Sequence, residues 1–149
     1  MGLDMNLIRK QYVKNWDHTP EKHRKNVEIF INGNKIKTKD LTYIEFDVMY
    51  WRKSNHIHNW FVKNCQDNKD DCRPAFIDIE QLKELSDLCV FVYKNKDKAK
   101  ELLPTTSGFF FGNMEYDKYY FEDLKETSDI LENIIKDHPE DEYIYQSSW

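Results

Sequence analysis

The first stretch of the sequence whose side chains can do chemistry combines two cations with aromatic rings and a histidine. It consists of Tyr50, Trp51, Arg52, Lys53, His58 and Trp60. A guanidinium and an ammonium can hold an anion, and indole rings can stack on a planar group or on a cation. A second interpretation stays open, in which this is a core helix whose arginine reaches solvent and whose histidine is hydrogen-bonded inside.

The second such stretch joins hydroxyl groups, glycines and a phenylalanine triplet. It runs Thr105-Thr106-Ser107-Gly108-Phe109-Phe110-Phe111-Gly112. The hydroxyls and a glycine can present donors to an oxyanion or a phosphate. The phenylalanines would line a pocket or, in the alternative interpretation, form a buried strand between turn glycines. We expect a ligand site if both stretches face one cleft, with these contact residues: Trp51, Arg52, Lys53, His58, Trp60, Thr105, Thr106, Ser107, Phe109 and Phe111.

Metal sites fit the sequence poorly. His56 and His58 are two residues apart, and on a helix this spacing turns the side chains about 200° from each other. Cys65 and Cys72 have no second Cys or His pair at a usable spacing. The acidic run over residues 67–71 has a lysine at a ligand position and no glycine at its sixth position, so a solvated turn is predicted instead of a calcium loop.

Catalytic motifs are also missing from the sequence. Cys65 and His58 are seven residues apart, about 10 Å along a helix and too far for a hydrogen bond. There is no Gly-x-Ser-x-Gly elbow and no glycine-rich phosphate loop ending in Lys-Ser or Lys-Thr. The sequence therefore predicts no catalytic residue, no metal ligand and no cofactor, although His58 with Glu115 or Asp117 leaves an acid–base pair open.

The elements that must position these stretches follow from the spacing of apolar residues. Alternation predicts a strand over residues 3–12, followed by a loop over 14–26. A hairpin is predicted over 27–37, because Asn32-Gly33 suits a type I′ turn. Three- and four-residue spacing predicts a central helix from about 45 to 65.

The second half of the chain has clearer helix signals. Asp78 and Gln81 form a capping box at the start of a second helix. A short helix over 97–103 and a long helix over about 116–136 follow, and Tyr143 to Tyr145 suggest a last strand. These elements predict an α+β fold, a small mixed or antiparallel sheet with about three packed helices, as a single domain over residues 1–149. The first strand is expected at a sheet edge, open to pairing with another chain.

Composition limits the partners and the compartment. The net charge of −5 disfavours bulk nucleic acid as a partner, although a local basic cluster can still hold a small anion. No apolar run approaches the roughly 18 residues of a membrane span. An odd number of cysteines, three, favours a reducing compartment, so we expect a cytoplasmic protein.

The motifs resemble those of an uncharacterised family of small proteins encoded by bacteriophages and bacteria. The resemblance is carried by Met-Gly-Leu-Asp-Met at residues 1–5, Tyr-Trp-Arg-Lys at 50–53, His-x-Trp at 58–60, the segment 103–112 and the C-terminal Ser-Ser-Trp. It spans the whole chain and implies a phage or mobile-element context in a host cytoplasm. It implies no activity and therefore no catalytic residues.

Three functions from different classes are consistent with the sequence. The first is a non-catalytic protein that binds a small anionic, ring-bearing ligand, such as a nucleotide or a nucleotide-derived signal, with a role in counter-defence. The second is an interaction module that blocks or adapts a host protein through the acidic stretches 67–71 and 115–123. An enzyme is the third and least supported. The oligomeric state stays open.

Overall fold

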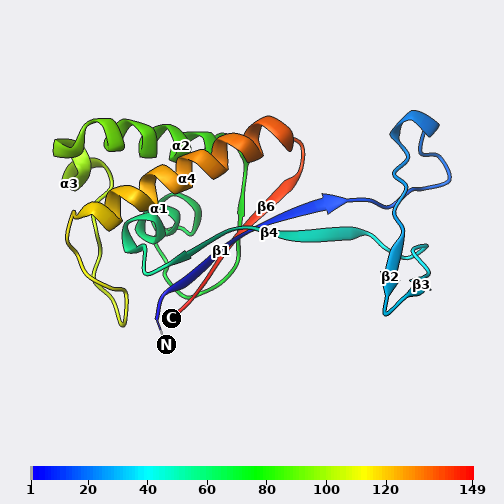
Figure 1. Cartoon of the computed structure of the whole chain (residues 1–149), viewed down its shortest axis with the longest axis horizontal. Coiled ribbons are helices and arrows are strands. Elements are labelled where there is room, and N and C mark those ends of the chain that lie inside the picture. Colours follow the sequence, from blue (N-terminus) through cyan, green and yellow to red (C-terminus); the bar gives the residue numbers. More distant parts are fainter. Residues whose placement is uncertain (1) are drawn as a thin grey trace.

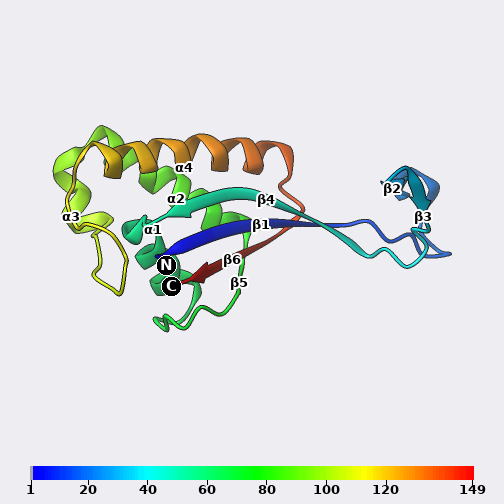
Figure 2. The same ribbon diagram turned by 60° about the horizontal axis from the view of Figure 1, so that its bottom comes forward.

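A four-stranded antiparallel sheet with helices on one face forms the body of the computed structural model, which describes residues 2–149 (Figures 1 and 2). Its strands, in sheet order, are β4 (Tyr43–Arg52), β1 (Asp4–Tyr12), β6 (Glu142–Ser148) and β5 (Ala75–Ile77). Every neighbouring pair in this sheet is antiparallel. The predicted α+β fold with an antiparallel sheet is confirmed.

The helices in residues 2–149 are α1 (Asn55–Cys65), α2 (Ile79–Lys94), α3 (Ala99–Leu102) and α4 (Lys118–Asp137), with 3-10 turns at Glu21–His23 and Lys96–Lys98. Side-chain hydrogen bonds cap the start of α2 and of α4, whereas α1 and α3 begin without one. The capping box of α2 is confirmed: the Gln81 backbone N–H donates to Asp78 at 2.8 Å, and the Asp78 N–H donates back to the Gln81 side chain at 2.9 Å. Asp117 caps α4 by accepting from the Tyr120 N–H.

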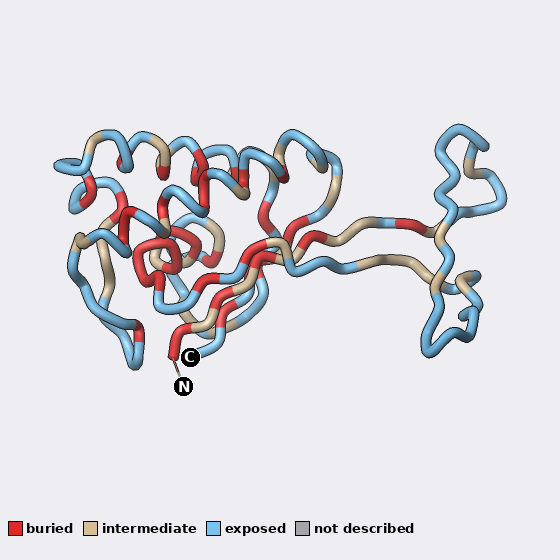
Figure 3. Tube along the Cα trace, in the orientation of Figure 1, coloured by how far each residue is buried: buried red, intermediate tan, exposed pale blue. Residues whose placement is uncertain are grey.

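The core lies between the helices and one face of the sheet. Alternate residues of the strands point to this face and are buried, among them Met5, Leu7, Met49, Trp51, Tyr143 and Tyr145. They pack on the inner stripes of α2 and α4, for example Leu82 and Leu131. Figure 3 shows the buried residues concentrated in this body. Aromatic rings fill much of it, as in the stacking of Phe61 on Tyr145 at 3.9 Å.

The helix predicted from about 45 to 65 is wrong over its first part. Residues 43–52 form β4, which pairs along its length with β1, and only Asn55–Cys65 is helical. Val48 and Trp51 are three residues apart, which also fits a helix, but the run is rich in aromatic and β-branched residues that favour strands. Pairing with a distant strand decides between the two periods.

Two further predictions about strands fail. β1 lies between β4 and β6, so it is not an edge strand; the sheet edges are β4 and β5. The C-terminal strand β6 pairs antiparallel with β1, with Met5 opposite Ser147, and covers the edge that the sequence left open. The segment 105–112 forms a loop without strand pairing.

An arm, defined here as residues 13–42, projects away from the body (Figure 1). β1 and β4 continue as a two-stranded ribbon to the pair Tyr12–Tyr43 and lead into it. At its tip, β2 (Ile29–Ile31) and β3 (Asn34–Ile36) form the predicted hairpin, with φ of 51° at Asn32 and 79° at Gly33. None of the helices in residues 2–149 has the length and apolar character that crossing a membrane requires.

Candidate functional site

The two stretches singled out in the sequence border one pocket of about 300 Å³. It lies between the end of β4, the start of α1 and the segment that leads into α4. We call it the mixed-charge pocket, and its lining residues are Arg52, Lys53, Asn55, His56, Thr105, Gly112, Asn113, Glu115, Asp117, Tyr119, Tyr120 and Asp123. Arg52, Lys53 and Thr105 are the predicted contact residues that reach it.

The turn between β4 and α1 brings the two cations to the pocket. Lys53 has a positive φ of 58°, which reverses the chain after the last residue of β4. Its side chain lies against Gly112, where an added Cβ would stand 3.0 Å from the Lys53 Cβ. Gly112 also has a φ of 92°, so two independent constraints favour glycine there.

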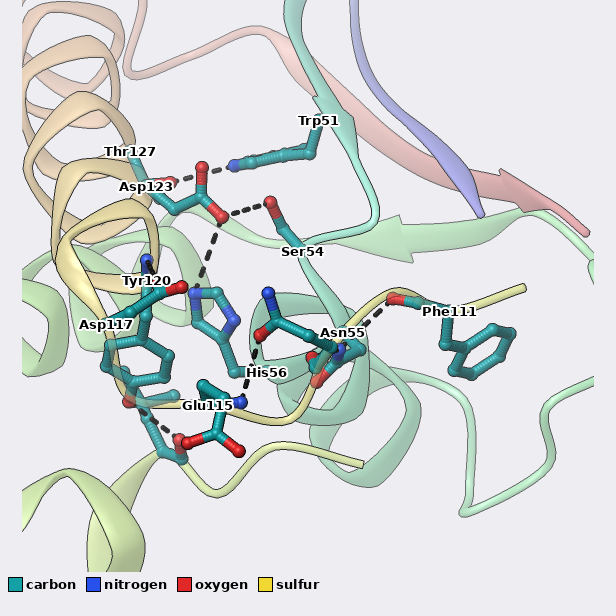
Figure 4. Close-up of polar contacts among 12 residues, drawn as sticks. Trp51, Ser54, Asn55, His56, Phe111, Glu115, Asp117, Tyr120, Asp123 and Thr127 are labelled. Atoms are coloured by element: carbon teal, nitrogen blue, oxygen red, sulfur yellow. Dashed lines mark hydrogen bonds and ion pairs between the residues drawn. The ribbon is translucent and has the colours of Figure 1, made fainter. Parts of the chain in front are cut away.

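Asn55 fastens the loop to the start of α1 (Figure 4). Its Nδ2 donates to the backbone oxygens of Phe111 at 3.1 Å and Asn113 at 2.9 Å, and its Oδ1 accepts from the Thr106 N–H at 3.0 Å. The side chain is buried, so these three bonds replace water. Asn55 thus fixes both ends of the phenylalanine segment against the helix.

The pocket carries charges of both signs. Arg52 and Lys53 are exposed, and neither forms an ion pair with a carboxylate in residues 2–149. Carboxylates of Glu115, Asp117 and Asp123 line the same pocket from the start of α4 and the segment before it. The pocket can therefore receive a ligand with an anionic group at one end and hydrogen-bond donors at the other.

His56 is the least satisfied polar side chain in the pocket. It is 3% exposed, and its Nε2 has no hydrogen-bond partner among residues 2–149. The nearest acid is Asp123, whose Oδ2 lies 3.9 Å away, beyond hydrogen-bonding distance. Burial lowers the pKa of His56 to about 3, although the nearby Asp117 carboxylate opposes this. The imidazole is therefore neutral near pH 7, and its Nε2 faces the Asp123 carboxylate at a distance too long for a hydrogen bond.

The pKa of Asp123 is shifted in the opposite direction. Burial raises the pKa of its carboxyl to about 6, against the lowering effect of a hydrogen bond from Ser54. The Ser54 hydroxyl donates to the Asp123 Oδ2 at 2.6 Å (Figure 4). Ser54 itself is 1% exposed and bonded to the acid, not to an imidazole, so it is not arranged as a nucleophile.

Three predicted contact residues lie in the core instead. The Trp51 indole donates to the Thr127 hydroxyl at 2.8 Å within the core. His58 is fully buried, with its Nδ1 2.6 Å from the Tyr145 hydroxyl and its Nε2 2.9 Å from Asp70. Trp60 is buried and borders a separate pocket of about 150 Å³ next to Pro104.

The hydroxyl and phenylalanine residues are dispersed. Thr105 donates to the Met114 backbone oxygen, and the Thr106 hydroxyl and Ser107 do not line the mixed-charge pocket. Phe109 is 70% exposed, whereas Phe111 is 4% exposed and packs edge-on against the His58 ring. The segment thus contributes Thr105 and Gly112 to the pocket wall, and Phe111 anchors it in the core. None of its phenylalanine rings lines the pocket.

Four pocket residues had weak signals in the sequence. In the sequence, His56 stands out only as half of an unsuitable zinc pair, and Asn55 belongs to no motif of its own. Tyr119 and Asp123 lie in the acidic stretch 115–123, which is predicted as a surface for a protein partner. Tertiary packing brings them together with Arg52.

Metal and thiol chemistry find little support among residues 2–149. No group of three or more His, Cys, Asp or Glu side chains there is placed to hold a metal ion. All three cysteines are free thiols. Burial raises the pKa of Cys65 to about 12, which leaves almost no thiolate at neutral pH.

The mixed-charge pocket is lined by two cations, three carboxylates and one buried imidazole, and within the described part of the chain the cations lack an ion pair and the imidazole Nε2 lacks a hydrogen bond. No family model, no curated protein and no solved structure matches the chain. These side chains and their surroundings are therefore what supports a ligand site.

Proposed function

We propose that this chain is a non-catalytic protein that binds a small anionic, ring-bearing ligand, a nucleotide or a nucleotide-derived signal, in the mixed-charge pocket. One observation carries the proposal: two cations that form no ion pair within residues 2–149 border the same pocket as a buried imidazole whose Nε2 has no hydrogen-bond partner there. Buried polar atoms are usually hydrogen-bonded, so an orphan in a pocket wall is a place where a ligand atom gains a bond.

The charge distribution supports a nucleotide over a simple anion. Arg52 and Lys53 can pair with a phosphate. Asp117 and Asp123 repel a ligand that is anionic throughout, but they can accept hydrogen bonds from the amino and ring N–H groups of a base. Tyr119 is 64% exposed and offers a ring for stacking. The pocket of about 300 Å³ is at the lower end of the usual range for ligand sites.

Binding is better supported than turnover or a purely protein-facing role. The acid–base candidate of the sequence, His58, is bonded on both sides to Tyr145 and Asp70 and does not line the pocket. Of the two acidic stretches behind the interaction hypothesis, 67–71 and 115–123, the second contributes three carboxylates to the pocket wall. In a phage, sequestration of a host nucleotide signal would be a counter-defence function.

A thermal-shift screen with mononucleotides, dinucleotides and cyclic nucleotides tests the proposal. Free ligand at about 100 times its dissociation constant adds about 2.7 kcal/mol to the free energy of unfolding. Arg52→Met with Lys53→Met should abolish the shift while keeping the aliphatic packing. Lys94→Met with Lys136→Met, exposed positions on α2 and α4, makes the same change in charge and should leave the shift intact. The absence of a shift with every nucleotide would contradict the proposal.

A further inference from the structure

The arm differs from the body in charge. Residues 13–42 contain seven Lys or Arg and four Asp or Glu, a net charge of +3 in a chain whose net charge is −5. The remainder therefore carries −8. The chain's net charge, which disfavours bulk nucleic acid as a partner, averages two ends of opposite sign.

A second pocket, of about 220 Å³, lies at the base of the arm. We call it the lysine pocket, because Lys14, Lys25 and Lys39 line it and no acidic side chain does. Asn15 and Thr38 add polar groups to its wall, and the other lining residues are apolar. No ammonium of the three lysines forms an ion pair with a carboxylate in the part of the chain that the structure describes.

The loop around the lysine pocket is held by its own hydrogen bonds. The Lys25 N–H donates to the Asn15 Oδ1 at 2.9 Å, and the Asn15 Nδ2 donates to the Lys25 backbone oxygen at 2.7 Å. The Lys25 Nζ donates to the Tyr12 backbone oxygen at 2.5 Å, and the Lys14 Nζ lies 4.2 Å from the Trp16 ring centre. A carbonyl therefore positions the Lys25 ammonium and a ring positions that of Lys14, and neither group compensates the positive charge.

The shape of the arm separates this charge from the acidic body (Figures 1 and 2). Pairing of β1 with β6 ends at Lys10, and the ribbon continues through Tyr12 to Val13. Three residues of strand span about 10 Å. The Debye length at physiological salt is about 8 Å, so the body's negative charge is largely screened at the lysine pocket.

Exposed aromatic side chains accompany the lysines. Trp16 is 48% exposed and Phe30 is 59% exposed. Cations interleaved with aromatic rings are typical of proteins that bind phosphates and unpaired bases.

We propose that the arm binds nucleic acid, with Lys14, Lys25 and Lys39 contacting backbone phosphates. A nucleic-acid strand presents a phosphate about every 3.4 Å, which lets several arm lysines be neutralised at once. The alternative partner, the acidic helix α4 of a second copy, already has part of its charge paired, as in Lys125–Asp129 at 2.6 Å. The arm site is separate from the mixed-charge pocket.

Fluorescence anisotropy with labelled 20-mers of single-stranded DNA, single-stranded RNA and duplex DNA tests the proposal. Three phosphate contacts predict an affinity that falls roughly 40-fold for duplex DNA and roughly 20-fold for a single strand between 50 and 200 mM NaCl. Lys14→Gln with Lys25→Gln and Lys39→Gln should weaken binding at least tenfold. Lys94→Gln with Lys118→Gln and Lys136→Gln, an equal change in charge on the helices, should change it less than threefold.

Three results would overturn the proposal: no binding of any 20-mer at 50 mM NaCl, equal losses in the arm and helix variants, or arm-dependent dimers in sedimentation without nucleic-acid binding. Circular dichroism of both triple variants checks that each is folded. Arg52→Met with Lys53→Met should keep nucleic-acid binding, and the arm variant should keep its nucleotide thermal shift. Failure of one proposal is thus distinguishable from failure of the other.

Discussion

A single buried amide connects the candidate site to the body of the molecule. Asn55 satisfies two carbonyls and one N–H of the loop that forms one wall of the mixed-charge pocket. Each of these backbone groups would be left without its side-chain partner if Asn55 were truncated. An unsatisfied buried polar group costs about 1–3 kcal/mol.

Asn55→Ala should therefore lower the free energy of unfolding by about 2–4 kcal/mol, since several buried groups lose their partner. Urea denaturation measures this change. Asn95→Ala is the matched control, because its side chain donates a single exposed hydrogen bond to the Phe91 oxygen. A loss at Asn55 no greater than at Asn95 would show that the loop does not depend on the amide.

His56 and Asp123 should give opposite pH dependences of stability. The pKa of His56 is lowered to about 3 on folding, so its contribution is lost as pH falls below the unfolded value of about 6.5. The pKa of Asp123 is raised to about 6, so its contribution is present at low pH and declines as pH rises from about 4 to 6. In the wild type the two slopes oppose each other in this window.

Asp123→Asn removes one of the two slopes. The free energy of unfolding of this variant minus that of the wild type should rise as pH increases from 4 to 6, because only the wild type loses the Asp123 contribution over this range. His56→Gln should show the reverse trend. Urea denaturation at half-unit pH steps measures both. Parallel pH profiles for the two variants would contradict the assignment.

At the scale of elements, the site depends on how the β4–α1 turn packs against the loop before α4. Gly112 combines a φ of 92° with a close approach to Lys53. In the arm hairpin, Gly33 has a similar φ of 79° but no neighbour within 4 Å of an added Cβ. The two glycines therefore separate the cost of backbone strain from the cost of a steric clash.

Gly33→Ala should cost about 1 kcal/mol, from backbone strain alone. Gly112→Ala should cost about 2–4 kcal/mol, because the Lys53 backbone and Cβ must also move. Thermal denaturation of both variants, with amide hydrogen exchange to follow the arm locally, gives the comparison. Equal losses of stability in the two variants would mean that the β4–α1 turn moves away from the added Cβ at no measurable cost.

At the scale of the whole molecule, the arm and the body have separate roles in stability. Of the buried apolar residues among positions 2–149, Val13 is the only one in the arm. The core cluster lies entirely in the body and does not include the arm. Hydrophobic burial is the main favourable term in folding, so the body should fold without the arm.

Replacing residues 13–42 by Asn-Gly should leave a folded body, because Tyr12 and Tyr43 already face each other across the ribbon. We expect cooperative unfolding, a nucleotide thermal shift like that of the full chain, and loss of nucleic-acid binding. Calorimetry and anisotropy measure these properties. An unfolded product would show that the arm contributes to the core after all.

Much of the fold follows from signals that act over a few residues. The capping box at Asp78, the Asn32-Gly33 turn and the long apolar stripe that becomes α4 are read correctly because each depends on neighbours in the sequence. Of the site, Arg52, Lys53 and Thr105 are predicted and border the pocket, whereas the predicted Trp51, His58 and Trp60 do not line it.

The sequence by itself determined the α+β class, the capped start of α2 and the arm hairpin. Only the tertiary structure decided that residues 43–52 form a strand, that β1 is central, and that His56 and not His58 borders the pocket. The physical reason is how far apart in the sequence the interacting groups lie. Caps and turns are satisfied by groups within about four residues. Strand pairing and pocket formation depend on groups many residues away, such as Asp123 beside His56.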